Sequence, residues 1–139
     1  MIQTQISEFI EPLKSEMVKI RETVFCDEQG FSREIELDGL DDDCIHVLAK
    51  SNDVYVGTGR MQTDGHIGRI AVLKDYRGNK IGSKIIETLI EYARSKKLTR
   101  VYLGSQVQAI AFYKNLGFQQ YGNIFLEEGV EHIHMELNL

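Results

Sequence analysis

The chain has 139 residues, which fits one domain, since typical domains contain about 100 to 200 residues. Its composition, 42% hydrophobic and 27% charged, excludes the disordered, collagen-like and disulfide-scaffold classes. The net charge of −5 argues against a nucleic-acid partner. The lack of a long apolar run or a secretory pattern argues against a membrane partner and favours a cytoplasmic location. We therefore expect a single domain over residues 1–139.

The net charge hides two charged segments of opposite sign. Residues 27–43 contain eight acidic side chains and one basic side chain, whereas residues 69–100 contain nine basic and three acidic side chains. Two interpretations remain open: a solvated loop followed by a helix with a basic outer face, or one region for a cationic ligand and one for an anionic ligand.

The N-terminal half predicts a strand, a helix, a loop and a three-stranded meander. Apolar residues alternate over residues 2–6, as in a short strand. A stripe with helical spacing runs from Leu13 to Val24, and Pro12 suits the first turn of that helix. The acidic segment after Gly30 is expected to form a long loop with room for a short helix. Turn signals then separate strands expected at 44–50, 54–62 and 67–73, which form an antiparallel meander.

The C-terminal half predicts a helix that begins near residues 78–80 and ends near Lys96, followed by strand 98–104 and helix 108–116. Strands at 118–121 and 131–137 complete the chain. The order β-α-β-β-β-α-β-α-β-β predicts an α/β fold of the α+β type, with a mixed, mainly antiparallel sheet and helices on both faces. The strand–helix–strand unit makes strands 67–73 and 98–104 parallel neighbours.

The most informative segment is the turn between the third meander strand and the following helix. It contains Arg77-Gly78-Asn79-Lys80-Ile81-Gly82. A turn of this kind points backbone N–H groups and the positive end of a helix at one place, and Arg77 and Lys80 add charge, so it suits a phosphate or pyrophosphate. Glycine-containing turns also occur here in α/β proteins that bind no ligand, and neither the P-loop nor the dinucleotide fingerprint is present.

The turn and the later segment Ala109-Ile110-Ala111-Phe112-Tyr113-Lys114-Asn115-Leu116-Gly117-Phe118 resemble the GNAT superfamily of N-acetyltransferases. Residues Val24 to Gln29, followed by Glu36, Asp38 and His46, resemble a subgroup of small, mostly uncharacterised bacterial members. The superfamily's pyrophosphate motif is Arg/Gln-x-x-Gly-x-Gly/Ala, in which Lys80 replaces the central glycine. If this position requires a positive φ, Lys80 crowds the turn; alternatively, its ammonium group contacts a phosphate.

The resemblance implies acetyl-CoA as co-substrate and a small-molecule or protein amine as acceptor, with direct attack in a ternary complex. It places the pantetheine beside residues 70–72 and the thioester where that strand separates from residues 101–104. Neither Cys26 nor Cys44 lies in the donor motif, so no acyl-cysteine intermediate is suggested, and both are expected to be reduced thiols. The coenzyme-binding residues would be Ile70, Ala71, Val72, Arg77, Gly78, Asn79, Lys80, Ile81, Gly82, Ser83 and Tyr113.

The resemblance also implies catalytic roles. Tyr113 would donate a proton to the leaving thiolate, although an aromatic residue on a short helix can also simply pack, and the N–H of Val72 would stabilise the oxyanion. The general base is open among Glu28, His132, His134 and a water chain. We favour His132 because residues 129–132 resemble a recurrent turn and strand start in the subgroup. No metal is expected, because no third ligand can be located beside the two histidines.

Three further points stay open. Glu28, Glu36 and Asp38 either attract a cationic amine or belong to a solvated loop. Because Lys80 departs from the motif and residues 66–69 lack the strand glutamate found in many relatives, a catalytically weak acyl-CoA-binding or regulatory module is the alternative function. The donor could also be another acyl-CoA such as succinyl-CoA, and the superfamily's frequent dimers make a homodimer one expected assembly.

Overall fold

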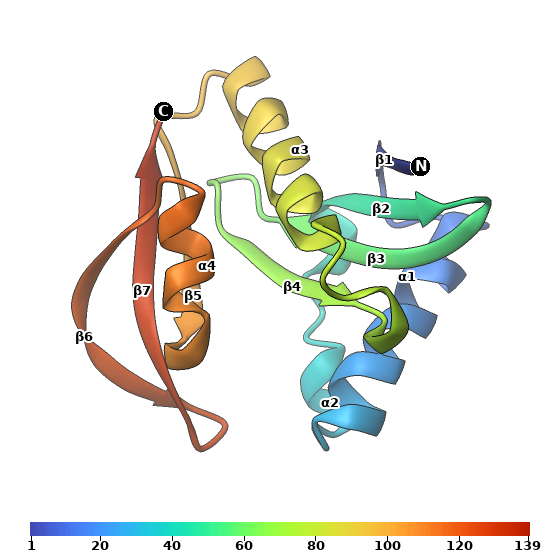
Figure 1. Ribbon diagram of the computed structural model, residues 1–139, viewed down its shortest axis with the longest axis horizontal. Coiled ribbons are helices and arrows are strands. Elements are labelled where there is room, and N and C mark those ends of the chain that lie inside the picture. The colour runs from blue at the N-terminus through green and yellow to red at the C-terminus, as the bar shows by residue number, and fades with distance from the viewer.

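The computed structural model describes residues 1–139 apart from the side chain of Ile35. Its strands are β1 (Ile2–Ser7), β2 (Ile45–Ser51), β3 (Val54–Met61), β4 (Ile67–Val72), β5 (Arg100–Gln106), β6 (Gln119–Glu127) and β7 (Val130–Asn138). Its helices are α1 (Leu13–Arg21), α2 (Arg33–Glu36), α3 (Ile81–Ser95) and α4 (Ile110–Asn115), and α1 continues as a π-helical segment over Glu22–Glu28. Short 3₁₀ turns lie at Asp41–Asp43, Lys74–Tyr76 and Val107–Ala109. The strands form two antiparallel sheets, in the orders β1-β2-β3-β4 and β5-β7-β6, so the fold belongs to the expected mixed α+β class (Figure 1).

The expected order of elements is confirmed, and the meander strands end within one residue of their expected bounds. The strand expected at 98–104 instead begins at Arg100, because Leu98 closes α3. The Leu98 N–H donates to the Ala93 carbonyl oxygen at 3.1 Å, and Lys97 has a left-handed φ of 61°. This is the hydrogen-bonded turn that commonly ends a helix, so the apolar Leu98 belongs to the helix terminus and not to the strand.

The strand expected at 118–121 is longer than its sequence pattern indicated. It runs from Gln119 to Glu127 as β6 and pairs with β7 on both sides of an irregularity between Tyr121 and Phe125. Gly122, with a φ of 73°, lies in this interruption. A bulge shifts the alternation of side chains, which is why the periodicity stopped at the glycine while the strand continued.

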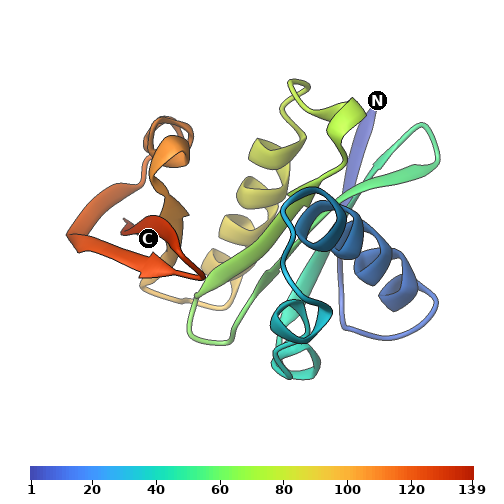
Figure 2. The ribbon, with the colours of Figure 1, turned by 90° about the horizontal axis from the view of Figure 1, so that it is seen from below.

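Helices cover both faces of the four-stranded sheet (Figure 2). On one face, Val47 and Ala49 of β2 belong to the core that includes the apolar stripe of α3. On the other face, Leu48 packs in a separate core with Met17 and Ile20 of α1. Successive side chains of a strand point to opposite faces, so one strand supplies both cores. None of the described helices is long and apolar enough to cross a membrane.

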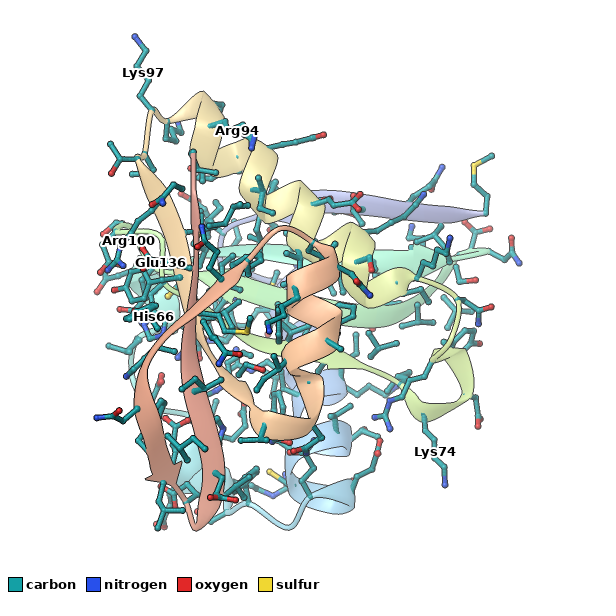
Figure 3. All side chains as sticks on the ribbon, turned by 60° about the vertical axis from the view of Figure 1, so that its left-hand side comes forward. His66, Lys74, Arg94, Lys97, Arg100 and Glu136 are labelled. Carbon is teal, nitrogen blue, oxygen red and sulfur yellow. The ribbon has the colours of Figure 1, made fainter. Side chains whose placement is uncertain are left out.

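The two sheets meet at one end only. β4 and β5 are parallel, as expected, but their pairing is a single bridge between His66 and Tyr102, whose rings stack with centroids 4.7 Å apart. The Tyr102 N–H donates to the Gly65 carbonyl oxygen at 3.0 Å. Figure 3 labels His66 at this end of the molecule together with Arg100 and Glu136, which pair at 3.3 Å. Beyond this joint β4 is the edge strand of its sheet, so its β5-facing side stays open among the described strands.

The two cysteines are free thiols. Cys44 is buried and Cys26 is partly buried. Desolvation by burial is the main cause that raises the pKa of both thiols, so both stay protonated near neutral pH and are poor nucleophiles.

Candidate functional site

A cleft of about 510 Å³ opens where β4 and β5 diverge. Residues far apart in the sequence meet around it: residues 67–70 of β4, Gln106 and Tyr113 after the divergence, Phe25, Phe31, Glu36 and Asp38 from the region of α1 and α2, and Glu127, Glu128 and His132 from the β6–β7 hairpin. Ile70, Tyr113, His132, Glu36 and Asp38 were named from the sequence as candidate site residues, and all of them line the cleft. The aromatic residues Phe25 and Phe31 and the amide of Gln106 were not named, since nothing in their local pattern distinguishes them from packing residues.

The backbone of Val72 faces the open edge of β4. Leu73 donates its N–H to the Val56 carbonyl oxygen of β3 at 2.9 Å. Because backbone groups alternate in direction along a strand, the N–H and carbonyl of Val72 point away from β3. In agreement, the Val72 carbonyl oxygen accepts a hydrogen bond from Nε of Arg77 at 2.9 Å. Ile70 has the same orientation as Val72, so this edge offers two N–H groups to a ligand.

The turn between β4 and α3 is suited to an anion. Residues 77–80 are exposed, and they lead into a helix of 15 residues whose first N–H groups have no acceptor within the helix. The helix dipole adds positive potential at this end. Four exposed cations lie on or beside the turn, namely Lys74, Arg77, Lys80 and Lys84. Figure 3 shows Lys74 projecting outward at the end of the molecule away from His66.

Tyr113 reaches the cleft from α4. Its ring contacts Phe112 edge-on with centroids 5.0 Å apart and Phe118 with centroids 5.8 Å apart, so packing fixes its position. Desolvation by burial raises the pKa of Tyr113 to about 12. No described residue forms a side-chain hydrogen bond with its hydroxyl group. The phenol is therefore a neutral donor that a ligand in the cleft can use.

His132 is buried on β7 with one ring nitrogen committed. Its Nδ1 lies 2.8 Å from the Val130 carbonyl oxygen, which can only accept, so Nδ1 carries a hydrogen. In the neutral ring Nε2 is then the acceptor, and it lies 3.5 Å from the Glu127 carboxylate. The ring stacks on Phe125 with centroids 5.6 Å apart. In its neutral form, an imidazole oriented in this way can accept a proton at Nε2.

His134 shares a face of β7 with His132, as expected from their spacing. Its ring stacks on Phe125 and Tyr121, with centroids 4.4 Å and 5.3 Å apart respectively. Its ring is thus occupied by stacking, and it does not line the cleft in the part of the chain that the structure describes. Among the described residues, no three His, Cys, Asp or Glu side chains gather as metal ligands would.

The family model for an acetyltransferase (GNAT) domain matches residues 11–139. The chain belongs to the GNAT acetyltransferases. It is 39% identical over 126 residues to uncharacterized protein YyaT of Bacillus subtilis, a match that covers 86% of this chain and 85% of YyaT. Among solved structures, ElaA of Escherichia coli has a TM-score of 0.86 at 28% identity, and an acyl-CoA N-acyltransferase from Pseudomonas aeruginosa has a TM-score of 0.85 at 26% identity. Each of these two matches covers 99% of both chains. The expected family is confirmed, and GNAT proteins use an acyl-CoA donor.

The GNAT pyrophosphate motif departs from its pattern at a position with special geometry. Lys80 has a φ of 62° and a ψ of 21°, the left-handed region that favours glycine. Gly78, with a φ of 87°, is the other left-handed residue of the turn. The position does require a positive φ, and Lys80 meets it with its side chain exposed. The turn is therefore open, and its exposed N–H groups and cations fit the pyrophosphate of the GNAT donor.

Glu28 lies beside the turn between β4 and α3. Its carboxylate pairs with Nη2 of Arg77 at 2.9 Å, while Nε of the same guanidinium binds the Val72 carbonyl oxygen. Glu28 is not among the described residues that line the cleft. In this structure Glu28 orients Arg77, which belongs to the turn between β4 and α3.

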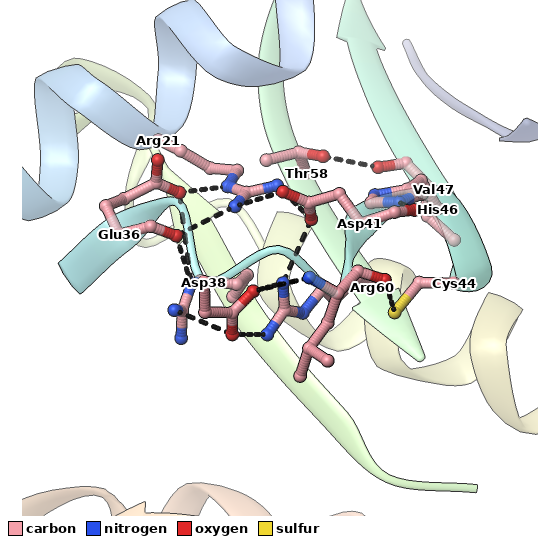
Figure 4. Close-up of polar contacts among 11 residues, drawn as sticks. Arg21, Glu36, Asp38, Asp41, Cys44, His46, Val47, Thr58 and Arg60 are labelled. Atoms are coloured by element: carbon pink, nitrogen blue, oxygen red, sulfur yellow. Dashed lines mark hydrogen bonds and ion pairs between the residues drawn. The ribbon is translucent and has the colours of Figure 1, made fainter. Parts of the chain in front are cut away.

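The acidic loop is held by three arginines that the sequence reading did not connect to it (Figure 4). Arg21, only 1% exposed, donates from Nε to Glu36 and from Nη1 and Nη2 to Asp41, at 2.8 Å and 3.1 Å. Arg60 on β3 donates from Nη1 to both Asp38 and Asp41 at 2.9 Å. The sequence held one signal for Arg21, because it lies four residues after Met17 and thus on the buried stripe of α1.

Arg69 on β4 joins this network to the cleft. Its Nε donates to the Glu36 carbonyl oxygen at 3.2 Å, and its Nη2 donates to Asp38 at 3.2 Å. Burial opposes ionisation of Asp38. Hydrogen bonds from Arg60 and from the Leu40 N–H outweigh this effect, together with the charges of Arg60 and Arg69, and lower the pKa of Asp38 to about 2. Three guanidinium groups thus balance Glu36, Asp38 and Asp41. At Glu36 and Asp38 the loop therefore forms a charge-balanced wall of the cleft, while Asp42 and Asp43 remain exposed.

Proposed function

We propose that this GNAT protein transfers an acetyl group from acetyl-CoA to an amine by direct attack in a ternary complex. The observation that carries the proposal is that Tyr113 and His132, a proton donor and a proton acceptor, line one cleft beside the open edge of β4. Neither cysteine lines that cleft within the described residues, which supports direct attack without an acyl-cysteine intermediate.

The transfer needs a neutral amine, a donor for the oxyanion and a proton for the leaving thiolate. Acetyl-CoA supplies the activated acetyl group. His132 accepts the proton of the amine at Nε2, because Nδ1 is committed to Val130. The Val72 N–H, directed to the open edge, stabilises the oxyanion. Tyr113 donates its phenolic proton to sulfur.

Coenzyme binding is assigned to the open edge and the phosphate turn. The backbone N–H groups of Ile70 and Val72 are oriented to pair with an extended chain laid along β4. The N–H groups of residues 81–83 and the side chains of Arg77 and Lys80 are suited to the pyrophosphate. The Nε of Arg77 can keep its hydrogen bond to the Val72 carbonyl oxygen while Nη2 exchanges the Glu28 carboxylate for a phosphate oxygen. This exchange needs no movement of the backbone.

Thiol release from acetyl-CoA, measured over a broad panel of amines, tests the function. We expect release that depends on one class of amine and that falls by roughly 10²-fold or more in His132→Gln, the size typical of losing a general base. His134→Gln is the matched control, since it removes the neighbouring ring on the same strand face. If no amine in the panel caused thiol release although acetyl-CoA bound tightly, the proposal would be overturned and an acyl-CoA-binding module would be favoured. The same assay with a panel of acyl-CoA donors would show whether the protein transfers another acyl group.

A further inference from the structure

Two carboxylates at the cleft lack a permanent countercharge. The network of Arg21, Arg60 and Arg69 balances the carboxylates of the opposite wall, whereas the β6–β7 hairpin adds Glu127 and Glu128. Glu127 pairs with His132, which is a cation only when protonated. No ion pair among the described residues includes Glu128. The cleft therefore holds two uncompensated negative charges on one hairpin.

Glu36 provides a second observation that is independent of the hairpin. The residue is 2% exposed and lines the cleft, and its Oε1 receives the Nε hydrogen of Arg21. Its Oε2 is buried and has no hydrogen-bond partner among the described residues. A buried carboxylate oxygen without a donor is unfavourable, and native proteins usually satisfy such atoms. The wall opposite the hairpin thus also lacks a hydrogen-bond donor.

The neutral form of His132 also lacks a hydrogen-bond donor. With a hydrogen on Nδ1, its Nε2 is an acceptor that lies 3.5 Å from another acceptor, the Glu127 carboxylate. An amino group between the two atoms would donate to both. Phe25 and Phe31 line the same cleft and offer aromatic faces that attract cations.

We infer that the acceptor in the proposed reaction is a small aliphatic diamine, in which one amino group reacts beside His132 and the second stays cationic against Glu127 and Glu128. This inference rests on the proposed acetyl transfer. The second, cationic amino group would lie against the two uncompensated carboxylates, and a cleft of about 510 Å³ accommodates a short chain. The guanidinium of Arg69 is already hydrogen-bonded to Asp38 and to the Glu36 carbonyl oxygen. It is therefore not offered to a substrate carboxylate in the cleft.

The reaction balances without another reagent. The amine nitrogen forms a bond to the acetyl carbon as the carbon–sulfur bond breaks. The proton that leaves the nitrogen passes to His132, and the departing sulfur takes a proton from Tyr113. The second amino group keeps its proton throughout and serves only to bind and orient the chain.

Three amines of equal chain length test the inference: putrescine, butylamine and γ-aminobutyrate, which end in a cation, a methyl group and an anion. We expect kcat/KM for acetylation to be about ten-fold higher for putrescine than for butylamine, with γ-aminobutyrate lowest, because two partly exposed ion pairs contribute modestly. The preference should shrink at high salt. Equal values for putrescine and butylamine, or preference for γ-aminobutyrate, would overturn the inference.

Charge-neutralising variants locate the second amino group. Glu127→Gln with Glu128→Gln should reduce the preference for putrescine over butylamine to less than about three-fold. Glu87→Gln with Glu91→Gln, two exposed positions on α3, removes the same charge away from the cleft and should leave the preference unchanged. An unchanged preference in the hairpin variant would contradict the placement.

Direct binding separates failure of the inference from failure of the proposed function. Calorimetric titration of the CoA-saturated protein should show tighter binding of putrescine than of butylamine, and the hairpin variant should lose that difference. If no amine is acetylated but this difference is found, the proposed function is wrong while the diamine site stands. If acetylation occurs but the difference is absent, the inference is wrong while the proposed function stands.

Discussion

Burial determines the chemistry available to Tyr113. Desolvation raises its pKa to about 12, so the phenol stays protonated over the whole range in which an aliphatic amine begins to lose its proton. A residue that must donate a proton benefits from this, whereas a residue that must accept one would not. The same burial that makes Tyr113 a packing residue on α4 therefore also keeps it in the form a general acid requires.

Replacement of Tyr113 by Phe should lower kcat for acetyl transfer by roughly 10²- to 10⁴-fold, the usual contribution of a positioned acid. The KM for acetyl-CoA should change much less, because the ring that packs against Phe118 is kept. Steady-state thiol release measures both values. In the wild-type protein kcat should show no decrease from ionisation of Tyr113 below about pH 11, since its pKa is about 12.

The control for this prediction is Tyr92→Phe, which removes a hydroxyl group from α3 in a tyrosine that does not line the cleft in the described part of the chain. Full turnover in Tyr113→Phe on its best substrate would remove Tyr113 from the mechanism. A loss of the same size in Tyr92→Phe would show that the effect comes from general damage to the fold.

Lys80 combines strain with charge, and two substitutions separate these effects. Lys80→Gly removes both, whereas Lys80→Ala removes only the charge. Because a left-handed backbone disfavours residues with a Cβ atom, we expect Lys80→Gly to exceed Lys80→Ala in free energy of unfolding by about 0.5–1 kcal/mol. Chemical denaturation measures the difference, and equal stability would show that the turn adapts to alanine without strain.

The contribution of the Lys80 charge can be measured through coenzyme A affinity. Both variants should bind coenzyme A about two- to five-fold more weakly than the wild-type protein, with a shallower dependence on salt, if the ammonium group helps to hold phosphate. Calorimetry at two salt concentrations measures this. Unchanged affinity in both variants would mean that Lys80 only fills a position normally given to glycine.

The acidic loop between α1 and β2 is held in place by arginines from two other elements. Arg21 of α1 is 1% exposed and donates hydrogen bonds to Glu36 and Asp41 at once. Replacing Arg21 with Met would leave two buried carboxylates without their main partner, so we expect a loss of about 3–5 kcal/mol in the free energy of unfolding. Urea denaturation monitored by circular dichroism measures this loss.

Arg33→Met is the matched control for this element. Arg33 pairs with Glu22, but its side chain is 61% exposed, so removal of this solvent-screened pair should cost far less stability than removal of Arg21. If Arg21→Met were no more destabilising than Arg33→Met, the buried network would contribute little and the loop would be held mainly by its apolar contacts.

These elements also show what the sequence could predict. Local periodicity identified the meander and α3, because their apolar residues recur with a strict period of two or 3.6. It failed at Leu98, which closes a helix, and at Gly122, where a bulge interrupts β6. It also could not connect Arg21 and Arg60 to the acidic loop, since an ion pair between residues 15 to 22 positions apart depends on how the elements pack. Motifs and resemblance named Tyr113, His132 and the acids Glu36 and Asp38 of the cleft, whereas Phe25, Phe31 and Gln106 join it only through the fold.

At the scale of the whole molecule, the two-sheet architecture leaves one edge of β4 open, and the proposed function assigns this edge to the coenzyme. The sheets share one joint at His66 and Tyr102, and beyond it the β5-facing backbone groups of β4 have no described strand partner. An extended ligand laid along this edge would occupy the place that a paired strand would otherwise take. Binding should therefore stabilise the contact between the two halves of the fold, and the molecule should melt at a higher temperature with coenzyme A present.

Amide hydrogen exchange tests this architecture at single residues. In the free protein the N–H groups of Ile70 and Val72 should exchange quickly, whereas that of Leu73, bonded to Val56 across the sheet, should be protected. Acetyl-CoA should slow exchange at Ile70 and Val72, because its pantetheine chain and thioester carbonyl supply acceptors along the edge, and should leave Leu73 unchanged. Protection that appears at the first N–H groups of α3 but not at Val72 would mean that the phosphate turn binds while the edge of β4 does not, and the assignment of Val72 to the oxyanion would then be wrong.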